Sequence, residues 1–229
     1  MLLLHNANIE EYKIYFTSEE TRRKREHDIW CITEAKVELG QELCSSLLLL
    51  HALLGCDTTS RLFNNGKGKA VTCFLKDPNF RKNATYFTTD TITADDVVEV
   101  GEKMLLKIYG AKKETTLDEF RNNKFFQKLS TSSNFIEPQY LCPTSDSTSH
   151  HILRVYHQVQ TWKGNLIDPL NWGWRLKDGK MMPVYTRKDP APSTLLKIIR
   201  CGCKTDCSKR TCTCVKYNLK CSKMCIECH

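Results

Sequence analysis

Residues 201–229 read CGCKTDCSKRTCTCVKYNLKCSKMCIECH, and this stretch decides how the C-terminal part of the chain folds. Eight of the 13 cysteines of the 229-residue chain lie in it, and His229 is its last residue. It has too few apolar residues to form a hydrophobic core, so either disulfides or metal ions must hold its structure. The eight thiols belong to Cys201, Cys203, Cys207, Cys212, Cys214, Cys221, Cys225 and Cys228.

The choice between metal and disulfide depends on the redox compartment. The N-terminal sequence MLLLHNANIEEYK lacks the basic start and the apolar length of a signal peptide. The longest apolar run, residues 47–54, is far shorter than the ~20 residues that span a bilayer. We therefore expect an intracellular protein with reduced cysteines and no membrane partner, and clustered reduced cysteines favour zinc. A disulfide knot and a thiol buffer like metallothionein are the alternatives.

The number of ligands indicates that some thiols are shared between ions. Three separate tetrahedral zinc ions need about twelve ligand positions, more than eight thiols and one imidazole supply. If three cysteines each bridge two ions, they fill half of these positions, and the other five cysteines with His229 fill the rest. Without His229, one position stays open to water or to another ligand. Basic residues between the thiols favour the thiolate form and can also face phosphates. The ones we assign to nucleic-acid contact are Lys204, Lys209, Arg210, Lys216 and Lys220.

The spacing of these cysteines resembles that of the CXC domain of tesmin and TSO1-like proteins. Residues 201–203 and 212–214 match its two CxC pairs, and a cysteine follows the first pair after a Lys-containing gap. That family folds around three zinc ions held by shared thiolates and binds DNA, so the resemblance implies three Zn²⁺ ions and a DNA partner. The chain departs from the family at residues 225–229, which close with CxxCH instead of CxCxxC. It also has Thr211 where the family often has an aromatic residue.

The segment 28–75 predicts a pair of helices joined by a glycine-rich turn. Thr33 has the character of an N-cap, and Gly40 interrupts the helix that follows it. Residues 41–54 are apolar on nearly every side, which predicts a buried helix. The turn at 64–69 then opens a short helix over 69–75.

The glycine-rich turn has the composition of an anion-binding site. Backbone N–H groups at Gly66 and Gly68, with the charges of Lys67 and Lys69, can bind a nucleic-acid phosphate. The spacing does not match the GxxxxGK[ST] pattern of a nucleotide-binding loop. An ordinary helical hairpin with a glycine turn is the alternative.

This segment resembles the late part of PIN-like nucleases of the flap endonuclease group. Residues 55–57, Gly-Cys-Asp, take the place of the family's GxD element, and residues 66–70 take the place of its phosphate-gripping turn. The resemblance implies that Asp57 is a remnant ligand for a divalent ion such as Mg²⁺. The first residues, MLLL, look like the end of the strand that carries the family's other carboxylates. Two-metal cleavage needs several carboxylates, so we expect no nuclease activity from the chain as given.

The middle of the chain is expected to be helical. Thr93 is a good helix start, Gly110 a good end, and residues 117–129 form a further helix. Residues 131–149, rich in Ser and Thr, predict a loop, and residues 152–162 an amphipathic helix.

Histidines and tryptophans of this middle region invite functional interpretations. His150, His151 and His157 lack the i, i+4 spacing of a zinc-binding helix, so we interpret them as a solvated helix edge. The rings of Trp162, Trp172 and Trp174 can stack on bases, but such residues more often anchor an irregular segment to a core.

Composition and charge set the overall interpretation. Hydrophobic residues make up 41% of the chain, which supports a core, and the net charge of +8 favours polyanionic partners. The basic run at 22–25 is either a solvated loop or a nuclear import signal. We expect an α/β protein, mostly helical as truncated, with four regions. These are a partial PIN-like domain with a helix–turn–helix at 1–89, a helical region at 90–184, a linker at 185–200 and an irregular multi-zinc cluster at 201–229.

The favoured function is zinc-dependent binding of nucleic acid, with DNA the expected ligand and the nucleus the expected location. A remnant or subunit of a structure-specific, metal-dependent nuclease is the enzymatic alternative. A zinc module that docks a protein is the third. Taken over nearly its whole length, the chain also resembles a group of transposon-associated or domesticated proteins of invertebrates, through LLxLHALxGCDTTS, LRVYxQVQxW, PLxWGW and the CxCK start of the tail.

Overall fold

The computed structural model describes ten stretches of the chain. They are residues 1–7, 13–17, 29–89, 91–131, 138–188, 201–204, 207, 212–217, 220–221 and 225. The chain divides into two compact units, unit 1 (Met1–Tyr185) and unit 2 (Thr186–His229), which are treated separately. Within the described residues, no helix combines the length and the apolar character needed to cross a membrane.

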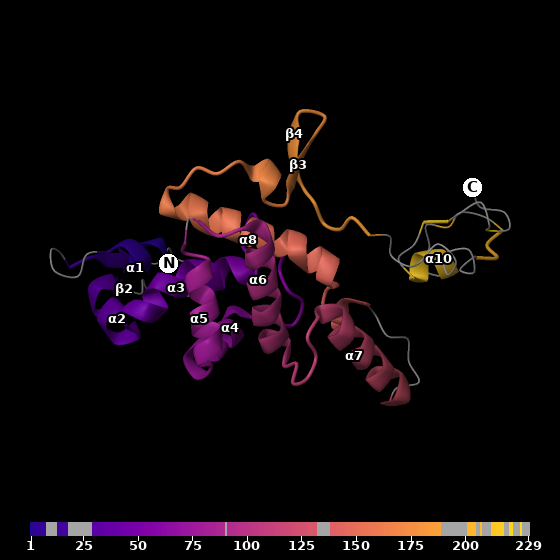
Figure 1. The fold of residues 1–229 in the computed structure, drawn as a ribbon, viewed down its shortest axis with the longest axis horizontal. Coiled ribbons are helices and arrows are strands. Elements are labelled where there is room, and N and C mark those ends of the chain that lie inside the picture. The colour runs from indigo at the N-terminus through magenta and orange to yellow at the C-terminus, as the bar shows by residue number, and fades with distance from the viewer. Residues whose placement is uncertain are drawn as a thin grey trace. The chain divides into compact units, whose positions relative to one another are not determined.

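Unit 1 is mostly helical, as the sequence indicates, and Figure 1 shows its course from indigo to orange. Its first elements are α1 (Leu2–Asn6), β1 (Tyr15–Thr17), β2 (Ile29–Cys31), α2 (Ile32–Leu39), α3 (Gln41–Leu53), α4 (Lys67–Lys76) and α5 (Pro78–Tyr86). Its later elements are α6 (Ala94–Tyr109), α7 (Leu117–Thr131), the 3-10 turn η1 (Pro138–Tyr140), α8 (Ser145–Lys163), the 3-10 turn η2 (Pro169–Asn171), β3 (Trp174–Lys177) and β4 (Lys180–Pro183).

The described strands form two separate antiparallel ribbons, β1 with β2 and β3 with β4. Neither ribbon is the parallel sheet that an α/β fold requires, so within the described residues only the helical part of the expected fold class is confirmed. The resemblance to a PIN-like nuclease gains no support from this architecture.

The first residues form a helix, so the expectation that MLLL ends a strand is wrong. The backbone N–H of Ala7 donates to the carbonyl of Leu3 at 2.8 Å and closes a helical turn. The buried ammonium of Lys36, in α2, donates to the carbonyls of His5 and Ala7 at 3.3 and 2.6 Å. A cation on the last carbonyls of a helix stabilises its C-terminus, which explains why this short segment is helical.

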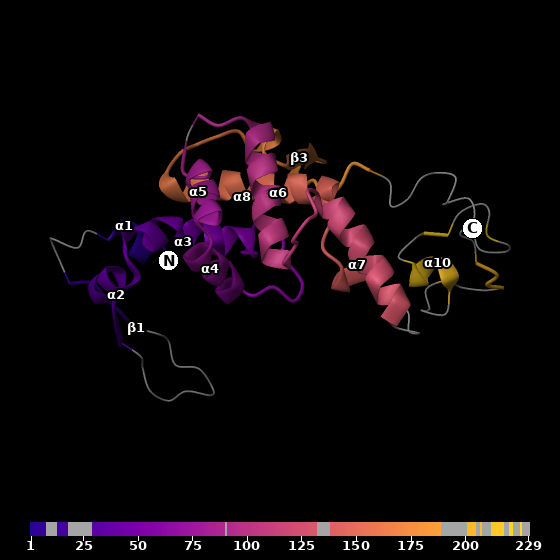
Figure 2. The same ribbon diagram turned by 60° about the horizontal axis from the view of Figure 1, so that its bottom comes forward.

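Helix α2 begins one residue before Thr33, so Thr33 is not its N-cap. The Thr33 hydroxyl instead accepts a hydrogen bond from the backbone N–H of Ile14 at 3.1 Å, next to β1. The break at Gly40 is confirmed, because this residue has φ +80° and ends α2 immediately before α3. Figure 2 shows α1, α2 and β1 gathered at one end of unit 1, with α7 at the other.

The core of unit 1 lies where α8 packs against α3 and α6. Helix α3 is buried on nearly every side, as its sequence predicts. Helices α6 and α8 cross in close contact at Gly101, where an added Cβ would lie 2.4 Å from a methyl carbon of Ile152. Figure 1 shows α6 running across α8 at this crossing. The expected N-cap of α6 is also confirmed, since the Thr93 hydroxyl accepts from the N–H of Asp96.

Helix α8 starts seven residues before the predicted start at 152, inside the stretch expected to be a loop. Thr144 caps it, with its hydroxyl accepting from the N–H of Ser147 at 3.2 Å. The extension turns His150 and His151 into the core, where they are 5% and 4% exposed. The interpretation of these two histidines as a solvated edge is therefore wrong.

Two tryptophans pack against this core, Trp162 from α8 and Trp172 from the irregular segment that follows it. Trp172 stacks on Tyr156 of α8 with ring centroids 4.4 Å apart, and Trp162 stacks on His51 of α3 at 5.6 Å. The anchoring interpretation is thus confirmed for Trp172, whereas Trp162 belongs to the core helix α8 itself.

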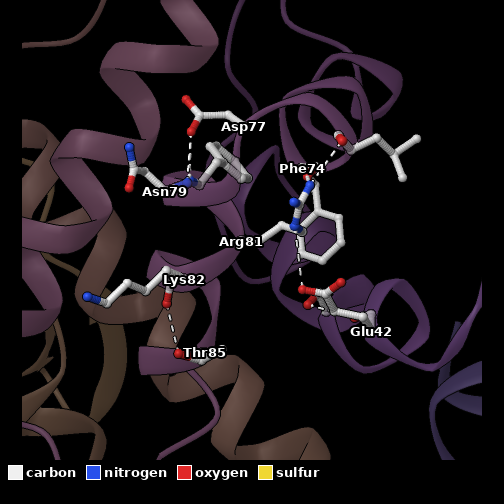
Figure 3. Close-up of polar contacts among 10 residues, drawn as sticks. Glu42, Phe74, Asp77, Asn79, Arg81, Lys82 and Thr85 are labelled. Carbon is white, nitrogen blue, oxygen red and sulfur yellow. Dashed lines mark hydrogen bonds and ion pairs between the residues drawn. The ribbon is translucent and has the colours of Figure 1, made fainter.

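The connection from α4 to α5 is held by polar contacts that Figure 3 shows in detail. Asp77 caps α5, because its carboxylate accepts from the N–H groups of Asn79 and Phe80 at 2.9 and 3.3 Å. The Arg81 guanidinium donates to the carbonyl of Phe74 at 3.1 Å, at the C-terminal end of α4, and forms an ion pair with Glu42 of α3 at 3.6 Å. These contacts fix α5 against α4 and α3.

Candidate metal centre

Unit 2 brings seven described cysteines into two groups of four that share one member. In the first group, the sulfur atoms of Cys201, Cys203, Cys207 and Cys212 all lie within 4.8 Å of one another. In the second, those of Cys201, Cys214, Cys221 and Cys225 do the same. Among the described residues these are the groups of three or more potential metal ligands. Cys201 belongs to both, which is the arrangement that a bridging thiolate requires.

The sulfur–sulfur distances match a tetrahedral metal site. Cys201 Sγ lies 3.9 Å from Cys207 Sγ and 3.8 Å from Cys221 Sγ, and Cys214 Sγ lies 3.5 Å from Cys225 Sγ. Four sulfurs at 2.3 Å from a zinc ion are about 3.8 Å apart at the corners of a tetrahedron. A disulfide needs about 2.05 Å, and all the described cysteines are free thiols. The described cysteines can therefore hold zinc, and the disulfide alternative gains no support from them.

The thiols form the interior of this unit. Cys201, Cys212, Cys214 and Cys225 are each at most 4% exposed and make up a buried cluster of their own. The short helix α10 (Thr213–Lys216) places Cys212 at its N-terminal boundary and Cys214 in its first turn. Sulfur thus takes the place that apolar side chains occupy in unit 1.

The thiols of the cluster differ in acidity. A hydrogen bond from the backbone N–H of Val215 lowers the pKa of Cys212 to about 6, which favours its thiolate. Burial and the adjacent thiol of Cys225 raise the pKa of Cys214 to about 12, so that thiol holds its proton at neutral pH. Metal ions bind the thiolate form, so metal binding at Cys214 releases a proton.

The predicted basic contacts of the cluster are described in part. Lys204, Lys216 and Lys220 are exposed, each within two residues of a clustered cysteine. Lys209 and Arg210 lie outside the described residues, as do two predicted ligands, Cys228 and His229. The described thiols form two groups that could each hold an ion, and the expected number of three zinc ions stays a prediction.

The glycine turn lies at the start of α4, two residues earlier than the helix start predicted from sequence. Gly66 precedes the helix and Gly68 lies in its first turn, and an added Cβ at either position meets no atom within 4 Å. Both lysines of the turn contact their own chain: Lys69 donates to the Asn65 side chain at 2.8 Å, and Lys67 lies 2.5 Å from the His51 ring. Packing within the chain does not require glycine at either position. Without a side chain there, the backbone is accessible to a ligand.

Asp57 is exposed in the turn after α3. Among the residues the structure describes, it joins no group of three or more potential ligands. The prediction of Mg²⁺ at Asp57 therefore gains no partner ligand. The basic run at 22–25, interpreted as a loop or an import signal, falls outside the described residues.

Sequence reasoning missed one exposed element, the hairpin of β3 and β4. Its signal is the Asp178-Gly179 pair between two short runs, WRLK and KMMP, which is the pattern of a two-residue hairpin turn. The identity of the shared thiol was also beyond the sequence, since any of the eight cysteines can bridge by spacing alone.

Comparison with models of protein families, with curated proteins and with solved structures finds no match to this chain. The thiol arrangement is compatible with a CXC-like zinc domain. The relationships to tesmin and TSO1-like proteins, to PIN-like nucleases and to transposon-associated proteins stay at the level of sequence resemblance.

Proposed function

We propose that unit 2 is a zinc-stabilised module that binds nucleic acid, with DNA as its ligand. The observation that carries the proposal is the pairing of a buried thiol interior with exposed cations. Two groups of four thiols share Cys201 inside the unit, and Lys204, Lys216 and Lys220 are exposed around them. Zinc then sets the positions of these lysines, and the lysines contact phosphates.

Two further features support the same ligand. Tyr217, directly after α10, is 50% exposed and can stack on a base beside the cations. In unit 1, Gly66 and Gly68 leave the start of α4 open to a phosphate, as a sequence-independent second contact. The nuclear location expected from the basic run at 22–25 belongs to this proposal.

Removal of zinc separates this proposal from simple attraction between a basic tail and DNA. Two zinc ions and seven thiolates carry a formal charge of about −3, whereas the zinc-free thiols, with only Cys212 ionised at neutral pH, carry about −1. Chelation therefore makes unit 2 more positive. A tail that binds through charge alone binds DNA more tightly after chelation, and a module that needs zinc for its shape binds more weakly.

The test measures fluorescence anisotropy of a labelled 20-base-pair duplex with the reduced full chain, before and after chelation. A zinc count by native mass spectrometry accompanies each sample. We expect at least two bound ions, a loss of affinity of about tenfold or more on chelation, and recovery on adding zinc but not Mg²⁺. Equal or tighter binding by the zinc-free protein would overturn the proposal.

A further inference from the structure

The β3–β4 hairpin of unit 1 is a regular two-stranded ribbon that stands out from the helices, as Figure 1 shows. Its register pairs Arg175 with Met182, Leu176 with Met181 and Lys177 with Lys180. Asp178 and Gly179 form the turn with φ of +51° and +71°, the left-handed values of a type I′ turn. The turn type fixes this register and the twist of the ribbon.

The register gives the ribbon a cationic face and an apolar face. Side chains of directly opposed residues share a face, and successive residues alternate between faces. Arg175, Lys177 and Lys180 therefore project on one side, together with Met182. Leu176 and Met181 project on the other side and are 62% and 43% exposed.

In the described part of the chain, the three cations of this ribbon form no ion pair, and the one carboxylate of the hairpin, Asp178, lies in its turn. Arg175, Lys177 and Lys180 are exposed. Lys177 and Lys180 are directly opposed across the strands, an arrangement that destabilises a hairpin. A bound polyanion would remove this repulsion.

The base of the hairpin is held rigidly. The buried guanidinium of Arg154 in α8 donates to the carbonyls of Gly173 and Val184, one on each side of the ribbon. The N–H of Val184 also donates to the carbonyl of Gly173 at 2.9 Å. Gly173 has φ +79°, and an added Cβ would lie 2.6 Å from the carbonyl oxygen of His150. The ribbon is thus presented in a fixed orientation, which reduces the entropy lost on binding.

We propose that the β3–β4 hairpin is a second DNA-binding element, which enters a groove of duplex DNA with its cationic face toward phosphates. Two strands about 4.8 Å apart, with their side chains, fit the major groove of B-form DNA, which is about 12 Å wide. The deep and narrow major groove of A-form RNA excludes such a ribbon. Met182, on the cationic face, is apolar and can contact a thymine methyl group. The proposal shares its ligand class with the proposed function of unit 2 but rests on different residues, so either can fail alone.

The test compares two variants of the zinc-loaded full chain that each remove three positive charges. The hairpin variant carries Arg175→Gln, Lys177→Gln and Lys180→Gln. The control carries Lys82→Gln, Lys112→Gln and Lys113→Gln, which are exposed elsewhere on unit 1. If all three hairpin cations contact phosphates, the slope of log affinity against log salt becomes shallower by about 2.7 in the hairpin variant and stays unchanged in the control.

Measurements of the unfolding temperature and of RNA binding test whether misfolding or a different ligand explains weaker DNA binding. Lys180→Gln alone removes the like-charge opposition, so it should weaken DNA binding while keeping or raising the thermal unfolding temperature. A lower unfolding temperature together with weaker binding would assign the loss to misfolding and overturn the proposal. A matched RNA duplex should bind with the same affinity to the hairpin variant and the wild type.

Membrane lipid is the other polyanionic surface that a ribbon with cationic and apolar faces can meet. Vesicles containing phosphatidylserine are titrated with the same proteins, and loss of vesicle binding in the hairpin variant with unchanged DNA binding would overturn the proposal. If the hairpin variant binds DNA with wild-type affinity and still loses affinity on chelation, only the proposal for the hairpin is overturned. Weaker DNA binding in the hairpin variant, with no effect of chelation, would support the hairpin and contradict the proposed function of unit 2.

Discussion

At the scale of single residues, Cys201 is the one thiol that belongs to both four-thiol groups of unit 2. We expect Cys201→Ser to lower metal binding at both thiol groups, whereas Cys203→Ser disturbs only the group that contains residue 203. Native mass spectrometry at limiting zinc measures the difference as the mean number of bound ions. Cys142→Ser, at a buried thiol of unit 1, should keep the wild-type count. Equal losses in the two cluster variants would contradict a shared role for Cys201.

Alanine substitutions at two glycines of the hairpin region distinguish the cost of backbone strain from the cost of a steric clash. Gly179 and Gly173 have φ of +71° and +79°, but an added Cβ meets nothing within 4 Å at Gly179 and meets the His150 carbonyl at 2.6 Å at Gly173. Gly179→Ala should cost about 1–2 kcal/mol through φ alone. Gly173→Ala should cost about 1–3 kcal/mol more, since a backbone atom must move. Denaturant unfolding followed by tryptophan fluorescence measures both, and similar losses would indicate that the contact at Gly173 is relieved without cost.

At the scale of elements, α4 contains a glycine that its own packing does not need. Gly68 lies in the first turn of the helix with open space around it. Gly68→Ala should stabilise unit 1 by up to about 1 kcal/mol, the helix-propensity difference of a helix interior. If a phosphate approaches the start of α4, the same change should weaken DNA binding.

Thermal unfolding measures the effect of Gly68→Ala on stability, and fluorescence anisotropy measures its effect on DNA binding. Thr85→Ala in α5, a helix position away from this turn, serves as the control for DNA affinity, and a Gly68→Ala protein with unchanged affinity would remove α4 from the proposed contacts.

Elements were predictable from sequence where a local signal fixes them. Thr93 caps α6 and Gly110 ends it with φ +81°, and both signals act within one helical turn. Helix α1 was not predictable in this way, because its stability depends on Lys36, which is 31 residues from His5 in the chain. Helix α8 was predicted too short because the weak signal of Thr144 competes with the Ser- and Thr-rich composition around it.

At the scale of the whole molecule, the two units are held by different chemistry. Unit 1 has an apolar core between helices, and unit 2 has a thiol interior. The cysteine spacing was enough to predict a metal site, because few other structures can use so many clustered thiols. Which thiols meet, and which one is shared, depends on the path of the chain in three dimensions. All four tryptophans of the chain, at positions 30, 162, 172 and 174, lie in unit 1, so their fluorescence reports on that unit.

One of the two buried histidines of α8, His151, predicts how unit 1 responds to acid. His151 is 4% exposed, its Nε2 lies 3.0 Å from the carbonyl of Leu53, and burial lowers its pKa to about 4. In the unfolded chain a histidine has a pKa near 6.5. Between these two values the unfolded chain binds a proton that the folded chain excludes. The stability of unit 1 should therefore be complete above about pH 6.5 and fall by up to about 3 kcal/mol as the pH decreases toward 4.

Urea unfolding followed by tryptophan fluorescence at several pH values measures this fall in unit 1, separately from acid release of metal in unit 2. His151→Gln keeps an N–H donor for the Leu53 carbonyl and cannot titrate, so its stability should depend less on pH over the same range. Burial also lowers the pKa of His51 and of His157. Both are less buried than His151, so in His151→Gln they should leave a smaller dependence of stability on pH. His51→Gln is the matched control and should keep most of the wild-type fall. If both variants lose the slope equally, the acid response belongs to the helix packing as a whole and the assignment to His151 is wrong.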